Sequence, residues 1–195
     1  MLLLVDLDGV VYRGAEPVPG VADVLADRAT RGDDIVYVTN NSMHYRADYL
    51  SRLTAMGAPV SADRIVSSAR ATAIFLVEGP DPVRRVLAVG MSGLRHELAD
   101  VGLDVVDAAD LVERLPAGPG RPLATGPDGL AGPGAEWSDP TANGDGREAF
   151  DLAGRPQALV VGLDLRFSYR VLAFASDVVR AGARFVATNR DPVFP

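Results

Sequence analysis

The sequence contains no cysteine and no excess of positive charge. Without cysteine there is no disulfide scaffold, no cysteine-ligated zinc and no thiol nucleophile, and the chain suits a reducing compartment. The net charge of −7 at pH 7 argues against nucleic acid as a partner. An acidic protein that binds an anionic substrate also needs a local cation beside that substrate.

Long apolar runs are absent as well. No segment approaches the roughly 20 apolar residues that cross a membrane, and the leading run 1–5 stops at Asp6, too early for a signal peptide. We therefore expect a cytoplasmic protein with no membrane partner. A chain of 195 residues, 48% hydrophobic and 23% charged, suits one globular domain or a domain with an insertion.

The most informative stretch is the apolar segment 2–5, which is followed by Asp6, Leu7, Asp8 and Gly9. The four apolar residues predict a buried strand. Side chains two apart on a strand point to the same side, so Asp6 and Asp8 address one small volume, and Gly9 permits a sharp turn. Two carboxylates at a strand end suit a bound cation together with nucleophilic or acid–base chemistry. A plain loop turn is the alternative.

Strands alternate with helices along the chain. The apolar spacing predicts a hairpin at 10–20, strands at 35–39, 64–66, 86–89, 103–106, 158–164 and 184–187, and helices at 21–31, 45–56, 69–77, 94–101 and 169–181. This alternation predicts an α/β fold with a parallel sheet, whose ligands bind outside the carboxyl ends of the strands. Because Asp6, Asp8, Thr39 and Asn40 all fall at such ends, we expect them to form one site.

Two further stretches depart from this alternation. The turn Gly90–Gly93 resembles a fragment of a dinucleotide-binding fingerprint, but the G-x-G-x-x-G spacing is absent and a structural turn is favoured. The segment 116–156 is rich in glycine and proline and poor in aliphatic residues, which predicts a flexible insertion or a long surface loop.

The two strand ends carry a family resemblance. Asp6-Leu7-Asp8-Gly9-Val10 and Val38-Thr39-Asn40-Asn41-Ser42 resemble the first two motifs of haloacid dehalogenase-superfamily phosphatases, in particular subclass IIA with its p-nitrophenylphosphatases and phosphoglycolate phosphatases. The stretches 160–164, 167–169 and 187–191 resemble the large cap of that branch. The resemblance implies an α/β protein with an incomplete Rossmannoid parallel-sheet core in residues 1–80 and an inserted α/β cap in residues 81–195.

The same resemblance implies a Mg²⁺-dependent phosphomonoester hydrolase that works through an aspartyl phosphate. It implies Asp6 as the nucleophile, Asp8 as the general acid and base, and Thr39 with the Asn40 backbone as the phosphate clamp. Mg²⁺ would be held by the Asp6 carboxylate and the Asp8 main-chain carbonyl. The implied substrates are small phosphorylated metabolites such as phosphoglycolate, glycerol phosphate, nucleoside monophosphates or aryl phosphates.

Several other polar residues are weaker candidates. We hypothesise that some of four polar residues contact the substrate: Asn41, Asp164, Asn189 and Asp191. Each of them is equally compatible with a turn-forming role. The run 40–42 also suits the cap of the following helix. Arg13 and Arg46 are interpreted as solvated rather than as phosphate ligands. A homodimer formed through the cap is kept open.

The chain departs from the family at two motifs. The third motif is a lysine and the fourth an acidic Gly-Asp run, and the sequence contains no lysine and no candidate for that run. The core prediction also offers only about three strands, fewer than an ordinary sheet of this kind. We therefore expect a fragment, a truncated product or one half of a split enzyme, with little activity of its own. The alternatives are a non-catalytic or regulatory module, and a small-molecule-binding α/β domain without phosphate chemistry.

Overall fold

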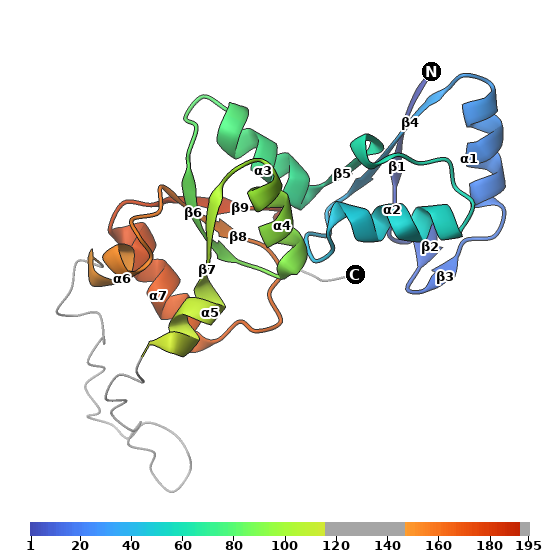
Figure 1. Cartoon of the computed structure of the whole chain (residues 1–195). Helices are drawn as coiled ribbons and strands as arrows, with labels where there is room; N and C mark the ends of the chain where they lie inside the picture. Colours follow the sequence, from blue (N-terminus) through green and yellow to red (C-terminus); the bar gives the residue numbers. More distant parts are fainter. Residues whose placement is uncertain (116–146, 192–195) are drawn as a thin grey trace, which may run out of the picture.

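The computed structural model describes residues 1–115 and 147–191, which form two lobes that each contain a parallel sheet (Figure 1). The first lobe contains a sheet with strand order β1-β4-β5 and a small antiparallel hairpin, β2–β3. Its elements are β1 (Leu2–Asp6), β2 (Tyr12–Arg13), β3 (Glu16–Pro17), α1 (Val21–Thr30), β4 (Asp34–Thr39), α2 (Arg46–Ala55), η1 (Ala62–Arg64) and β5 (Ile65–Ser67).

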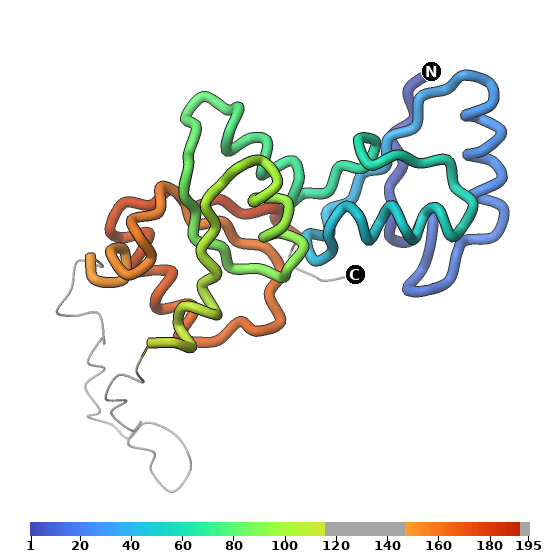
Figure 2. Tube along the Cα trace, viewed as in Figure 1, coloured from blue at the N-terminus to red at the C-terminus, as the bar shows by residue number. Residues whose placement is uncertain are grey.

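The second lobe contains a parallel sheet with strand order β7-β6-β8-β9. Its elements are α3 (Ser68–Glu78), β6 (Arg85–Val89), α4 (Ser92–Asp100), β7 (Asp104–Asp107), α5 (Ala108–Arg114), α6 (Arg147–Leu152), β8 (Ala158–Val161), α7 (Tyr169–Arg180) and β9 (Arg184–Ala187). After β9 the chain returns to the junction between the lobes (Figure 2). The predicted α/β fold with parallel sheets is confirmed.

Helix α7 shows how the sequence specifies these elements. Its first turn is capped by Ser168, whose hydroxyl accepts the backbone N–H of Val171. Apolar residues then recur at helical spacing and form one buried stripe, made of Val171, Phe174, Ala175 and Val178. The chain leaves the helix at Gly182, whose φ of 115° favours glycine. The helix predicted at 169–181 is therefore confirmed.

The border between the two hydrophobic cores falls earlier than the expected border after residue 80. Helix α3 buries Ala69 and Leu76 in the same cluster as Val86 of β6 and Leu94 of α4. The chain passes from β5 directly into α3, and Ser67 accepts the Arg70 N–H as the cap of this helix. By packing, α3 belongs to the second lobe.

Strand β1 is less buried than its apolar sequence predicts. Leu3 and Val5 pack against the core of the first lobe, but Leu2 is 57% exposed and Leu4 66% exposed. These two side chains lie on the opposite face of the sheet, which the described residues leave open, and β1 is an edge strand. The prediction of a fully buried strand is wrong for this face.

The glycine-rich segment 116–156 is described only from residue 147 onward. There the structure has helix α6 in place of the predicted loop, and Ala149 and Ala153 are buried in the core of the second lobe. Residues 116–146 lie outside the described part of the chain. Within residues 1–115 and 147–191, no helix is both long enough and apolar enough to span a bilayer.

Candidate functional site

The carboxyl ends of the three parallel strands β1, β4 and β5 meet at one edge of their sheet. Asp6 is the last residue of β1 and pairs with Val38, the residue before the end of β4. Thr39 is the last residue of β4 and pairs with Ser67, the last residue of β5. Parallel pairing therefore brings Asp6 and Thr39 to the same edge, where ligands bind in sheets of this kind.

Asp8 and Thr39 are in direct contact. The Thr39 Oγ1 hydroxyl donates a hydrogen bond of 3.3 Å to Asp8 Oδ2 and accepts the backbone N–H of Asn41 at 3.1 Å. Thr39 is buried, Asp8 is half-buried and Asp6 is exposed. The structure thus holds one carboxylate in place through the neighbouring strand and leaves the other open to solvent.

The turn after Asp8 depends on Gly9. Its φ of 85° lies in the left-handed region, and its N–H donates to the Tyr12 carbonyl at 2.7 Å. The N–H of Val11 donates back to the Leu7 carbonyl at 3.0 Å, which closes the turn. The chain therefore reverses immediately after the two carboxylates and enters the hairpin β2–β3.

The pKa of the buried Tyr12 phenol depends on the charges of Asp8 and Asp6. Burial raises the pKa of Tyr12 to about 12, and the negative charges of Asp8 and Asp6 add to the rise. The Arg52 guanidinium, 3.5 Å from the centre of the Tyr12 ring, acts in the opposite direction.

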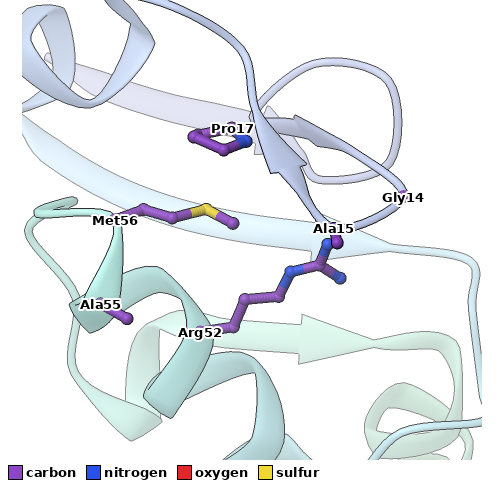
Figure 3. A pocket seen from close by; sticks show the side chains of 6 residues that line it. All are labelled: Gly14, Ala15, Pro17, Arg52, Ala55 and Met56. Carbon is purple, nitrogen blue, oxygen red and sulfur yellow. The ribbon is translucent and has the colours of Figure 1, made fainter.

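A surface pocket lies on the hairpin side of α2 (Figure 3). Arg52 is its single charged lining residue, and its side chain extends toward Ala15 at the turn of the hairpin. The other lining residues are Gly14, Pro17, Ala55 and Met56. None of the strand-end residues lines this pocket, so it is separate from the candidate site.

Asn40 lies where the two lobes meet. Its carbonyl accepts hydrogen bonds from Ser68 Oγ at 2.6 Å and from Asn189 Nδ2 at 2.8 Å. Its side-chain amide donates to the Asp191 carboxylate, and the Asp191 N–H donates to Asn189 Oδ1. The structure therefore brings Asn189 and Asp191, residues distant in sequence, beside Asn40.

The remaining sequence candidates are placed differently. Asn41 shapes the loop, because its Oδ1 accepts the Met43 N–H and its carbonyl accepts the Tyr49 hydroxyl. Asp164 lies in the loop after β8, where it is buried and accepts the Arg166 N–H at 2.8 Å. No contact described in the structure joins Asp164 to the strand-end site.

Two residues at the lobe junction have roles that sequence reasoning missed. Ser68 follows the end of β5, so its position after a parallel strand was the available signal. Arg46 is not solvated as interpreted, because its guanidinium pairs with Asp100 at 2.7 Å. The exposed Arg13 lies in β2 of the hairpin, and it forms no ion pair with the described residues.

The carboxylates suit a magnesium ion better than a metal that needs a closed protein cage. Within the described ranges, no three or more His, Asp and Glu side chains gather as the ligands of a metal ion. Mg²⁺ is commonly held by one or two carboxylates, with waters and substrate phosphate oxygens as the other ligands. The exposed Asp6 carboxylate at the end of β1 fits that requirement.

The sequence and the fold resemble those of known phosphatases. The sequence model of a family described as haloacid dehalogenase-like hydrolase matches residues 3–104. An acid sugar phosphatase of Staphylococcus saprophyticus is 31% identical over 192 residues, which are 98% of this chain and 56% of that protein. The solved p-nitrophenyl phosphatase of Archaeoglobus fulgidus has a TM-score of 0.70 and 25% identity, over 100% of this chain and 56% of that one.

A second solved relative was obtained with a metal ion. The glycerol phosphate phosphatase of Mycobacterium tuberculosis, in complex with magnesium, has a TM-score of 0.66 and 28% identity. The match covers 100% of this chain and 45% of that one. The chain thus spans about half the length of the relatives that it matches.

Proposed function

The chain belongs to the haloacid dehalogenase-like hydrolases, and from this premise we propose that its strand-end site binds and hydrolyses phosphomonoesters of small metabolites. The observation that carries the proposal is the Asp8–Thr39 hydrogen bond at the carboxyl edge of the sheet, where the exposed Asp6 ends β1. Carboxylates and a hydroxyl at one edge of a sheet are the groups that phosphoryl transfer through an aspartyl phosphate needs.

Asp6 is the proposed nucleophile, because it is the exposed carboxylate of the pair. One of its oxygens attacks phosphorus and the bond between phosphorus and the ester oxygen breaks, which leaves an acyl phosphate on Asp6. Asp8 gives a proton to the departing alcohol and then takes one from the water that hydrolyses the acyl phosphate. In this structure the Thr39 hydroxyl donates its one proton to Asp8 Oδ2, and it would turn to a phosphoryl oxygen when the substrate binds.

The clamp for the phosphoryl oxygens is proposed at Thr39 and the Asn40 backbone. Thr39 is buried and fixed by two hydrogen bonds, and Asn40 is fixed through its carbonyl. Polar groups held in place before the reaction stabilise developing charge without reorganising. The Asp6 carboxylate and the Asp8 carbonyl are the proposed ligands of Mg²⁺, which when bound offsets the repulsion between carboxylate and phosphate.

The substrate is proposed to be a small phosphorylated metabolite, such as a sugar phosphate or glycerol phosphate. This follows the activities that name the relatives: acid sugar phosphatase, glycerol phosphate phosphatase and p-nitrophenyl phosphatase. Asn189 and Asp191 lie beside Asn40 and are the better candidates for substrate contacts. Asn41 and Asp164 are weaker ones, since Asn41 shapes its loop and Asp164 lies apart.

We propose that the 195 residues alone turn over slowly. The sequence contains no lysine, and no arginine of the described ranges forms an ion pair with Asp6 or Asp8. An acyl phosphate on Asp6 would therefore have no lysine beside it and no arginine already paired with these carboxylates. Ordinary turnover of p-nitrophenyl phosphate with Mg²⁺ by the purified chain would contradict this part of the proposal.

The binding part is tested with beryllofluoride, which mimics a phosphoryl group on a carboxylate. Wild-type chain with Mg²⁺ and BeF₃⁻ should melt at a higher temperature than without them, because a ligand of the folded state stabilises it. Asp6→Asn should abolish the shift, and Asp23→Asn, an exposed aspartate in the first turn of α1, should keep it. A shift with nucleotides but not with BeF₃⁻ would instead favour a small-molecule-binding module.

We also propose that two copies associate through the second lobe. Strand β9 is an edge strand, and Phe185 on it is 58% exposed. Tyr169 and Leu172 of α7 are exposed as well. An exposed apolar side chain on an edge strand favours association. Sedimentation should show a dimer that Phe185→Ser weakens, and a monomeric wild type would contradict it.

A further inference from the structure

Contacts with the second lobe hold the loop 40–45, which follows the strand-end residue Thr39. In the sheet β7-β6-β8-β9, the chain goes from β6 to its neighbour β7 on one side, and the later strand β8 pairs with β6 on the other side. The strand order therefore reverses at β6. A crevice at such a reversal of strand order is where a ligand binds in many α/β sheets. Here residues 42–44 of the chain itself lie at that place.

Two glycines allow this close approach. The Gly93 N–H, in the first turn of α4, donates to the Met43 carbonyl at 3.0 Å. A Cβ on Gly93 would lie 2.3 Å from the His44 carbonyl carbon, and one on Gly162 would lie 2.6 Å from Ser42 Oγ. The turn Gly90–Gly93 therefore binds the protein's own backbone, in agreement with the structural interpretation of that turn.

Glu97 of α4 makes the most buried of these contacts. Its side chain is fully buried, and Oε1 accepts the backbone N–H of Arg46 at 3.1 Å. Arg46 is the first residue of α2, so this N–H has no partner within its own helix. A carboxylate from the second lobe thus satisfies the amino end of the helix that follows the loop.

The other Glu97 oxygen faces two guanidinium groups. Oε2 lies 3.7 Å from Arg70 Nη1 of α3 and 4.0 Å from Arg46 Nη1 of α2, and it has no hydrogen bond within the described structure. At the rim, Asp100 accepts from Arg46 Nη2 at 2.7 Å and from the Tyr45 hydroxyl at 2.5 Å. The amino end of α2 is therefore held by α4 through several charged contacts.

We propose that Glu97 is a positioning residue, which fixes the loop 40–45 and thereby the presentation of Thr39 and Asn40 to a phosphoryl group. The presentation of Thr39 and Asn40 to a phosphoryl group rests on the proposed function. The fixing of the loop by Glu97 does not. A buried carboxylate that only filled space would be replaceable by any side chain of similar volume. One that positions the loop is replaceable only by a hydrogen-bond acceptor.

The experiment measures amide hydrogen exchange and BeF₃⁻ affinity in the full 195-residue chain. Glu97→Ala should speed exchange of the Arg46 amide and of the amides of residues 41–45 by at least about tenfold, because the loop opens locally once its acceptor is gone. It should weaken BeF₃⁻ binding in Mg²⁺ by about tenfold. Glu97→Gln keeps the acceptor, so exchange at Arg46 should stay near wild type. Glu113→Ala, an exposed glutamate of α5, is the matched control and should change neither.

A second variant covers the case in which Glu97→Ala does not fold. Gly93→Ala keeps the charge of Glu97 but displaces the same loop through the Cβ contact, and it should speed exchange in residues 43–45. The inference would be overturned if a folded Glu97→Ala chain exchanged these amides at the wild-type rate. It would also be overturned if Glu97→Gln exchanged them as fast as Glu97→Ala. If exchange rises as expected but the wild type binds no BeF₃⁻, the positioning of the loop stands and the proposed function fails. If the wild type binds BeF₃⁻ but Glu97→Ala changes neither exchange nor binding, the proposed function stands and the positioning role of Glu97 fails.

Discussion

The Thr39 hydroxyl donates to the Asp8 carboxylate, 3.3 Å away, and joins the end of β4 to the turn that follows β1. The same hydroxyl oxygen accepts the Asn41 N–H, so a single side chain fixes the carboxylate on one side and the loop on the other. Because Thr39 is buried, few alternative rotamers or solvent contacts compete with this arrangement. The geometry of the candidate site therefore depends on this one hydroxyl.

Replacement of Thr39 tests this dependence. Thr39→Val keeps the branched shape but leaves the Asn41 N–H and Asp8 without their partner, so we expect a loss of about 1–3 kcal/mol in unfolding free energy. BeF₃⁻ binding should weaken at least about tenfold, whereas Thr39→Ser, which keeps the hydroxyl, should bind nearly as wild type. Urea unfolding and calorimetry measure the two effects. Thr54→Val removes an exposed helical hydroxyl and should leave binding unchanged.

Removal of the phenolic hydroxyl should affect stability differently at two buried tyrosines beside the site. Tyr49 donates to the Asn41 carbonyl at 3.1 Å, so Tyr49→Phe should lower the unfolding free energy by about 1 kcal/mol. The Tyr12 hydroxyl is buried without a hydrogen bond in the described structure. Tyr12→Phe should therefore be neutral or stabilising by up to about 1 kcal/mol. Equal destabilisation of the two variants in urea would contradict this difference.

Glu97 should make stability depend on pH. Burial raises the pKa of Glu97 above its ordinary 4.5, and Asp100 adds to the rise, while Arg46, through its charge and its backbone N–H, and Arg70 oppose it. The folded chain then keeps a proton that the unfolded chain has released. The associated stability is complete below pH 4.5 and is lost as the pH rises through the folded-state pKa.

The comparison with Glu97→Gln isolates this contribution, because glutamine does not titrate. The unfolding free energy of wild type minus that of the variant should fall as the pH rises from 4.5, by about 1.4 kcal/mol for each unit of raised pKa, and then level off. Urea unfolding over a series of pH values measures the difference. A difference that is constant from pH 4 to pH 8 would mean that burial does not shift this carboxyl.

The contact between Gly162 and Ser42 predicts a coupling between two substitutions. Gly162→Ala alone should cost about 1–3 kcal/mol, because the new Cβ would lie 2.6 Å from Ser42 Oγ. Ser42→Ala removes that oxygen, so the double variant should cost about 1 kcal/mol less than the sum of the single variants. The four unfolding free energies form a double-mutant cycle. As a control, Ser61→Ala in an exposed turn should combine additively with Gly162→Ala.

Most secondary structure could be predicted from the sequence, because apolar spacing and glycine stops are local signals. The helix predicted at 169–181 has its cap at Ser168 and its stop at Gly182. Two predictions depended on packing and were less successful. The outer face of β1 is open because no described element covers it, and α3 joins the second lobe because its alanines pack on β6 and α4.

The sequence by itself determined which groups stand at the strand ends, since Asp6, Asp8 and Thr39 follow from the register of apolar strands and the turn at Gly9. The family resemblance rests on the same residues. Only the tertiary structure decided which distant groups meet them: Glu97 at the amino end of α2, and Asn189 with Asp191 beside Asn40. The physical reason is that periodicity reports the face on which a side chain lies. The partner that covers this face depends on how the two lobes pack.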